Sequence, residues 1–96
     1  MFDKMKELME MKKQADQIKR ELDAENVEST DVRGIKIVIN GSQEFKTIEI
    51  DESLINPANK QKLQNDLLRS MNGAIRKSQN IAAQKMKNMM PGFPGL

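Results

Sequence analysis

The segment from residue 35 to residue 54 is the one clear β pattern in this chain, and it lies between two long helical patterns. Isoleucine occupies every second position of residues 35–39, which is typical of a strand with one buried face. The pair Asn40-Gly41 follows, and these residue types tolerate the positive φ angles of a tight hairpin turn. Alternation resumes over residues 45–50, so the segment predicts two antiparallel strands joined by a hairpin.

Helical periodicity flanks this hairpin on both sides. Apolar residues recur every three or four positions over residues 8–22, and again over residues 63–82. Asn56-Pro57 predicts the start of the second helix, because Asn is a good cap and Pro needs no hydrogen-bond partner at the first helical position. A weaker β pattern over residues 26–32 predicts one more strand between the first helix and the hairpin.

These elements predict a two-layer α+β fold in the order α-β-β-β-α, with a three-stranded antiparallel meander and long projecting terminal helices. We expect residues 1–90 to form a single domain and residues 91–96, PGFPGL, to form a flexible tail. The predicted core consists of residues from the two hairpin strands and the last helix: Ile35, Ile37, Ile39, Ile48, Ile50, Leu63, Leu67 and Met71.

The expected lengths of the elements determine a shape. The first helix, about 20 residues, would be roughly 30 Å long, and the last, about 30 residues, would be roughly 45 Å long. A six-residue strand covers only about 20 Å, so both helices must extend past the sheet. Their far ends can lie antiparallel as an arm that carries lysines from both helices: Lys4, Lys6, Lys12, Lys13, Lys85 and Lys87.

Charge is distributed unevenly along the chain. Residues 57–96 hold seven basic residues and a single acid, Asp66, for a net charge of +6, whereas residues 26–56 carry −3. A helix of one sign favours polyanionic partners. The same spacing is also that of an ordinary solvated helix face, and the sequence leaves both interpretations open.

The composition argues against several classes of function. The chain has no Cys and no His, which removes thiolate metal sites and the commonest general base. It has no phosphate-cradling glycine loop and no nucleophile elbow, so we predict no enzyme activity, cofactor, metal or small-molecule substrate. No apolar run approaches membrane-spanning length and no signal-peptide pattern opens the chain, so we expect a cytoplasmic protein.

Two segments carry a resemblance to a known family. Residues 36–41, KIVING, and residues 48–54, IEIDESL, occur between an amphipathic first helix and a long last helix. In this order they resemble the YbaB/EbfC family of bacterial nucleoid-associated proteins. One difference is that the approach to the second strand has a single glycine, Gly34, where family members often have about three.

The resemblance implies a tight homodimer with projecting helical arms, duplex DNA as partner, weak sequence preference, and a role in nucleoid organisation or gene expression. The absence of Trp and Tyr fits duplex binding through phosphates better than base stacking on single strands. We predict these DNA-binding residues: Lys4, Lys6, Lys12, Lys13, Arg76, Lys77, Lys85 and Lys87. The sheet face with Val38, Phe45 and Thr47 is predicted to contribute to the dimer interface.

Two alternatives stay open. Methionines concentrate at the predicted arm tips, and Met adapts to irregular partner surfaces, so the chain could be a small helical adaptor that binds another protein. They are Met1, Met5, Met9, Met86, Met89 and Met90. The same residues also serve as ordinary filler between two helices. Peripheral membrane binding by the basic last helix is the weaker alternative, since few large apolar residues follow Leu68.

Overall fold

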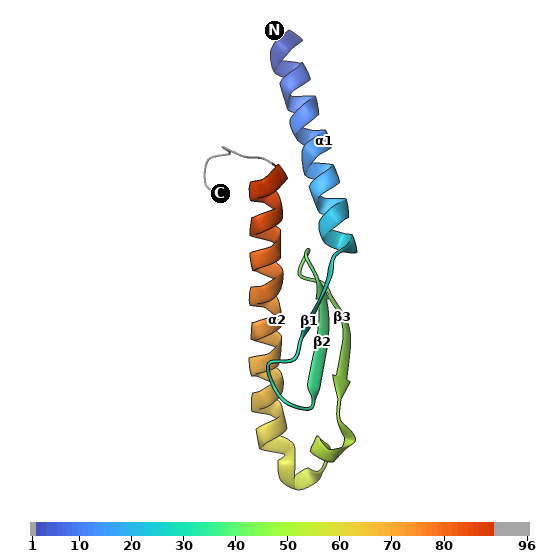
Figure 1. The fold of residues 1–96 in the computed structure, drawn as a ribbon, viewed down its shortest axis with the longest axis vertical. Helices are drawn as coiled ribbons and strands as arrows, with labels where there is room; N and C mark the ends of the chain where they lie inside the picture. The colour runs from blue at the N-terminus through green and yellow to red at the C-terminus, as the bar shows by residue number, and fades with distance from the viewer. Residues whose placement is uncertain (1, 90–96) are drawn as a thin grey trace.

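The computed structural model describes residues 2–89 of the chain, with side chains from residue 3 to residue 88. Its elements follow the predicted order α-β-β-β-α (Figure 1). They are α1 (Phe2–Ala24), β1 (Asn26–Ser29), β2 (Ile35–Asn40), β3 (Phe45–Ile50), two 3₁₀ turns, η1 (Glu52–Leu54) and η2 (Pro57–Asn59), and α2 (Lys60–Met89). The sheet is the predicted antiparallel meander, in the order β1-β2-β3. The predicted tail, residues 91–96, lies outside the described residues.

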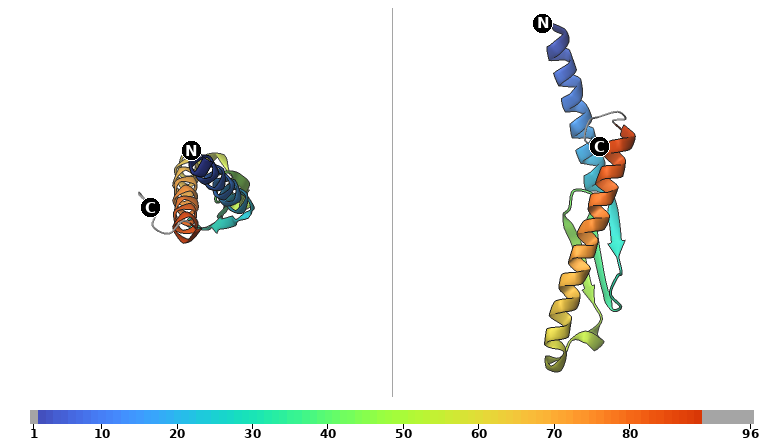
Figure 2. Two further views of the ribbon diagram at one scale, coloured as in Figure 1. Left: turned by 90° about the horizontal axis from the view of Figure 1, so that it is seen from above. Right: turned by 90° about the vertical axis from the view of Figure 1, so that its left-hand side faces the viewer.

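The molecule is a long rod of two layers, with extents of 67 × 20 × 17 Å. One layer is α2, and the other is the sheet with α1 continuing from its end (Figures 1 and 2). Helix α2 runs beside the sheet and then beside the C-terminal part of α1. The N-terminal turns of α1 project beyond the end of α2, so the two helices form an arm of unequal lengths (Figure 1).

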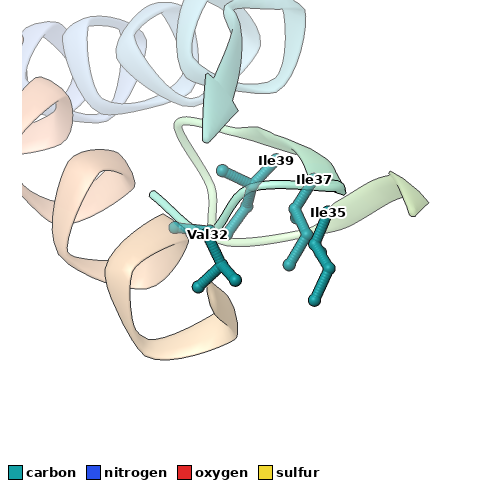
Figure 3. Packing of buried hydrophobic residues seen from close by; sticks show 5 residues of the cluster. Val32, Ile35, Ile37 and Ile39 are labelled. Carbon is teal, nitrogen blue, oxygen red and sulfur yellow. The ribbon is translucent and has the colours of Figure 1, made fainter. Parts of the chain in front are cut away.

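The core lies between α2 and the strands β1 and β2. Ile37, Ile39 and Ala74 are fully buried, and Ile35 and Val32 complete the cluster (Figure 3). Partly buried apolar side chains surround it: Val27, Leu54, Leu63, Leu67 and Ile75. The alternation over residues 35–39 therefore predicted the buried face of β2 correctly.

Two residues of the predicted core are exposed instead. Ile48 is 50% exposed and Met71 is 37% exposed. Ile48 does pair with buried Ile37 across the sheet, so it lies on the helix-facing side. However, α2 packs mainly against β1 and β2, and this side of β3 is left uncovered.

The pairing of β2 with β3 contains a register shift that moves Phe45. Val38 pairs with Thr47, but the next residue, Ile39, pairs with Phe45, which leaves Lys46 as an extra residue in β3. Phe45 therefore shares the helix-facing side with Ile39. The prediction that Phe45 lies on the outer face with Val38 is wrong. It assumed strict alternation along β3, and the bulge breaks that alternation.

Both turns of the meander use a left-handed residue, one of them at an unexpected position. Gly34 has a φ of +90°, and a Cβ there would lie 2.7 Å from Leu54 Cδ1, so this single glycine provides the turn before β2. In the β2–β3 hairpin the positive φ falls on Gln43, at 65°, rather than on Asn40-Gly41. The predicted tight turn is thus a longer loop, closed by a bond from Asn40 N to Glu44 O of 2.9 Å.

The start of the last helix is also more gradual than predicted. Pro57 does open a helical segment, but it is the 3₁₀ turn η2, and α2 begins only at Lys60. The side chain of Asn56 makes no capping hydrogen bond. Just upstream, Asp51 does act as a cap, because its carboxylate accepts a hydrogen bond from Ser53 N at 3.0 Å.

Candidate nucleic-acid interface

Four of the predicted DNA-binding residues lie on the projecting part of α1. Every described side chain from residue 3 to residue 17 is exposed, so these lysines point into solvent. They are Lys4, Lys6, Lys12 and Lys13. None of the four forms an ion pair with another residue in the described part of the chain. Their charges are therefore available to a polyanion.

Lys85 has a different environment from the arm lysines. Its ammonium lies 2.6 Å from the carboxylate of Glu25, one residue beyond the end of α1. The hydrogen bond from Lys85 to Glu25 raises the pKa of Lys85 above its ordinary value. Lys85 thus lies at the base of the arm, whereas the predicted arm carries it alongside Lys4 and the other lysines of α1. The reason is that α1 reaches far beyond the end of α2.

The remaining predicted cations, all on α2, differ from one another. Lys77 lies 3.3 Å from the carboxylate of Asp31, in the turn between β1 and β2, so part of its charge is compensated. Arg76 and Lys87 are exposed and have no ion pair with any residue that the structure describes.

Arg76 and Lys87 belong to a longer row on the solvent side of α2. Residues spaced by three, four or seven lie on one face of a helix. The row, which we call the α2 outer row, consists of Asn65, Arg69, Asn72, Arg76, Asn80 and Lys87, and all are exposed. Four of them, together with Leu68, line a shallow depression of about 330 Å³: Asn65, Arg69, Asn72 and Arg76. The row contains cations and amide donors and no acid.

Sequence reasoning missed Arg69 as a candidate. Its guanidinium lies 3.3 Å from Asp66, whose other oxygen is 2.6 Å from Lys62. Two cations share one carboxylate, so this cluster keeps a net positive charge. The spacing of Lys62, Asp66 and Arg69 by four and three residues was visible in the sequence and could have revealed the arrangement.

Helix α1 carries a shorter cationic row. Lys6, Lys13 and Arg20 are seven residues apart, all exposed, and lie opposite the apolar side that contains buried Ile18. Arg20 was not among the predicted residues. Acidic residues Glu7 and Glu10 occupy the neighbouring side of the helix, so α1 is mixed in charge where the α2 outer row is not.

The described residues contain neither a metal-binding cluster of acidic side chains nor a membrane-spanning helix. Among residues 2–89, no group of three or more acidic side chains converges as a metal site would require. In the same part of the chain, neither helix has the length of apolar sequence needed to cross a membrane.

The chain is a small α+β protein of the order α-β-β-β-α, and its long last helix carries a single acid, Asp66, among its basic residues. A family model confirms the resemblance seen in the sequence: residues 1–93 match the YbaB/EbfC DNA-binding family. Since the match covers nearly the whole chain, this protein belongs to that family.

Similar proteins extend over the same length. A protein of Syntrophobacter fumaroxidans is 30% identical over 98 residues, which cover 99% of this chain and 89% of the relative. One from Chloroflexus aurantiacus is 33% identical over 93 residues, covering 96% and 93%. One from Pelotomaculum thermopropionicum is 33% identical over 95 residues, covering 96% and 90%. All three bear the name nucleoid-associated protein.

Proposed function

We propose that this protein binds duplex DNA as a nucleoid-associated protein, mainly through Lys and Arg contacts to phosphates. The observation that carries the proposal is the α2 outer row, an exposed and acid-free face on a helix in the most basic part of the chain. Family membership and the names of the relatives support the same partner. Phosphate contacts carry no sequence information themselves, so we expect weak sequence preference.

The proposed DNA-contact residues are the eight predicted from the sequence and two more that the structure suggests. Arg76 and Lys87 are expected to contribute most on α2, because their charges are exposed and uncompensated within residues 2–89. Lys77 and Lys85 are expected to contribute less, since each already faces a carboxylate. The four predicted residues on α1, all exposed, are Lys4, Lys6, Lys12 and Lys13, and the additions are Arg69 and Arg20.

We further propose that a second copy of the chain covers the uncovered side of β3. Phe45, Ile48 and Met71 are exposed apolar residues there, at 43%, 50% and 37% respectively, and Leu68, 63% exposed, lies three residues before Met71 on the same helix. Phe45, Ile48 and Met71 line one groove of about 290 Å³. A patch of this kind is a typical interaction surface. Because Leu68 also borders the α2 outer row, a dimer formed here would place two cationic rows beside each other.

The test of DNA binding is fluorescence anisotropy of a labelled random-sequence duplex, titrated with protein at several salt concentrations. If about six phosphates are neutralised, the logarithm of the binding constant should fall with log salt at a slope near −5. A slope near zero would reject the phosphate mechanism, and no binding at low salt would reject the function.

Two charge-reversal variants test whether DNA contacts the α2 outer row. Arg76→Glu should weaken binding and make the salt slope shallower, because it removes a cation from the α2 outer row. Arg33→Glu is the matched control, since Arg33 is exposed in the β1–β2 turn, outside both rows. Equal effects from both variants would mean that net charge matters and that the row does not.

The adaptor alternative also has a structural observation in its favour. The projecting part of α1 exposes several large apolar side chains: Met5 at 66%, Leu8 at 63%, Met9 at 62% and Met11 at 46%. Under this alternative, Met5→Glu would abolish capture of a protein partner, and DNA affinity would be unaffected. Met86 is half-buried, and Met1, Met89 and Met90 lie outside the described side chains.

A further inference from the structure

The C-terminal end of α1 is capped by a segment that is distant in the sequence. The last carbonyls of a helix have no partner within it, and commonly a glycine that follows or a basic side chain satisfies them. Here Glu25 and Asn26 follow α1, and its last turn has no basic residue. Instead, Gly41 N donates to Leu22 O at 2.9 Å and to Glu25 O at 3.0 Å.

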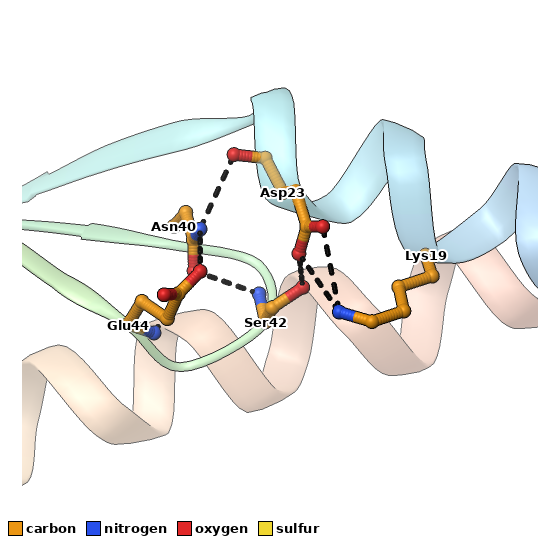
Figure 4. Close-up of polar contacts among 5 residues, drawn as sticks. All are labelled: Lys19, Asp23, Asn40, Ser42 and Glu44. Atoms are coloured by element: carbon orange, nitrogen blue, oxygen red, sulfur yellow. Dashed lines mark hydrogen bonds and ion pairs between the residues drawn. The ribbon is translucent and has the colours of Figure 1, made fainter.

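The side chain of Asn40 continues this cap. Its Nδ2 donates to Asp23 O at 3.2 Å (Figure 4). Together with the two bonds from Gly41, the tip of the β2–β3 hairpin therefore binds three backbone carbonyls around the end of α1, those of residues 22, 23 and 25. The Ser42 hydroxyl also donates to the carboxylate of Asp23, which forms an ion pair with Lys19 at 3.4 Å.

Asn40 also fixes the hairpin tip itself. It is fully buried, and its Oδ1 accepts hydrogen bonds from Ser42 N at 3.0 Å and Glu44 N at 2.9 Å. Its backbone carbonyl accepts a hydrogen bond from the buried Ser78 hydroxyl of α2 at 2.7 Å. A single residue therefore connects the end of α1, the hairpin and α2.

The hairpin tip and α1 are in very close contact. A Cβ on Gly41 would lie 2.8 Å from Leu22 Cδ2 and 3.2 Å from Leu22 Cα, so only glycine fits without displacing the helix. Beyond this point α1 has few other restraints. All side chains from residue 3 to residue 17 are exposed, and Ile18 is the first buried one.

We propose that this joint, formed by Asp23, Asn40, Gly41 and Ser42, sets the direction in which α1 projects, and that Asn40 is a positioning residue for DNA binding by the α1 lysines. The role of Asn40 in DNA binding rests on the proposed function. Asn40 is buried and uncharged, so it acts through the placement of α1 and not through contact with DNA.

The experiment measures distances across the joint by electron spin resonance. The chain has no cysteine, so Glu7→Cys in α1 and Gln61→Cys in α2 provide unique label positions at two exposed sites. Dilution of labelled protein with unlabelled protein restricts the measurement to pairs within one chain. The distances are recorded without DNA, and DNA affinity is then measured on the same proteins.

Two variants loosen the joint in different ways. Gly41→Ala introduces a methyl group against Leu22. The backbone tolerates alanine here, because Gly41 is not one of the residues with positive φ, which within residues 2–89 are Gly34 and Gln43. Asn40→Asp keeps the acceptor oxygen for Ser42 N and Glu44 N but removes the donor to Asp23 O and to the Glu44 carboxylate. Val32→Ala is the control, because it weakens the core without touching the joint.

We expect both joint variants to shift or broaden the distance distribution and to weaken DNA binding several-fold, whereas Val32→Ala changes neither. An unchanged distribution in both joint variants would overturn the proposed joint. A changed distribution with parental DNA affinity would overturn the role of Asn40 in DNA binding. Failure of the parent protein to bind DNA would reject the proposed function and that role together, while the distances would still decide whether the joint directs α1.

Discussion

The body of the molecule, where α2 packs on the sheet, and its arm share a helical spacing of apolar residues but have very different surroundings. Both α2 and α1 show apolar residues at helical spacing. In the body, α2 covers β1 and β2 and buries Ile37, Ile39 and Ala74 completely. In the arm, the apolar side of α1 contains Leu8 and Met11, which are 63% and 46% exposed.

This difference teaches that helical periodicity identifies the side of a helix that can be buried, but not whether anything covers it. Coverage depends on where the neighbouring elements end. Helix α2 stops beside the C-terminal part of α1, so the same periodic pattern becomes a packed core along the sheet and an exposed surface beyond it (Figure 1).

The largest expected effect contrasts the two regions directly. Ile37→Ala should lower the free energy of unfolding by about 2–5 kcal/mol, because it leaves a cavity in the core. Leu8→Ala should change it by less than about 0.5 kcal/mol, as expected of an exposed side chain. Urea denaturation at one protein concentration measures both. A large loss for Leu8→Ala would show that another copy buries the arm in solution.

A smaller effect is expected where the body meets the joint. Ser78→Ala removes the buried hydroxyl that donates to Asn40 O, and should cost about 0.5–1.5 kcal/mol of unfolding free energy, because Gln43 N still donates to that carbonyl. Its neighbour Gln79 is exposed, so Gln79→Ala serves as control and should stay within about 0.5 kcal/mol. If the two variants unfold at the same denaturant concentration, the hydroxyl contributes nothing to the body.

The smallest effect concerns a single carboxyl group at the base of the arm. The hydrogen bond from Ser42 is the main cause that lowers the pKa of Asp23 in the folded chain. Stabilisation from this group is therefore present above its unfolded pKa and is lost as pH falls through its folded pKa. Ser42→Ala should raise the pKa of Asp23 and reduce that acid-side loss of stability, part of which remains because Lys19 also lowers this pKa.

Carboxyl NMR titration measures this pKa directly. Asp51 is an internal control, because backbone and side-chain hydrogen bonds from Ser53 lower its pKa and Ser42 plays no part. An unchanged pKa of Asp23 in the variant would show that the Ser42 contact is absent in solution.

The sequence predicted the elements well because their patterns are local. The alternation over residues 35–39 predicted the buried face of β2, and the helical spacing predicted both long helices. The positions of the exposed lysines on α1 followed from the helix alone, since each side chain from residue 3 to residue 17 reaches solvent.

The incorrect predictions concern relations between distant elements. Ile48 lies on the side of the sheet that faces α2, as the alternation predicts. No sequence pattern shows, however, that α2 covers β1 and β2 and leaves β3 uncovered. Phe45 was placed on the wrong face because Lys46 is an extra residue in the ladder. The ion pair of Lys85 with Glu25 spans 60 residues and depends on the unequal reach of the two helices.

The projecting α1 also makes the molecule a lever whose pivot is the hairpin tip. About 20 residues of helix extend from that pivot, or roughly 30 Å at about 1.5 Å per residue. A rotation of about 10° at the pivot would move the tip sideways by roughly 5 Å over that length. How precisely Lys4 and Lys6 are positioned therefore depends on how rigidly Asn40 and Gly41 hold the opposite end of the helix.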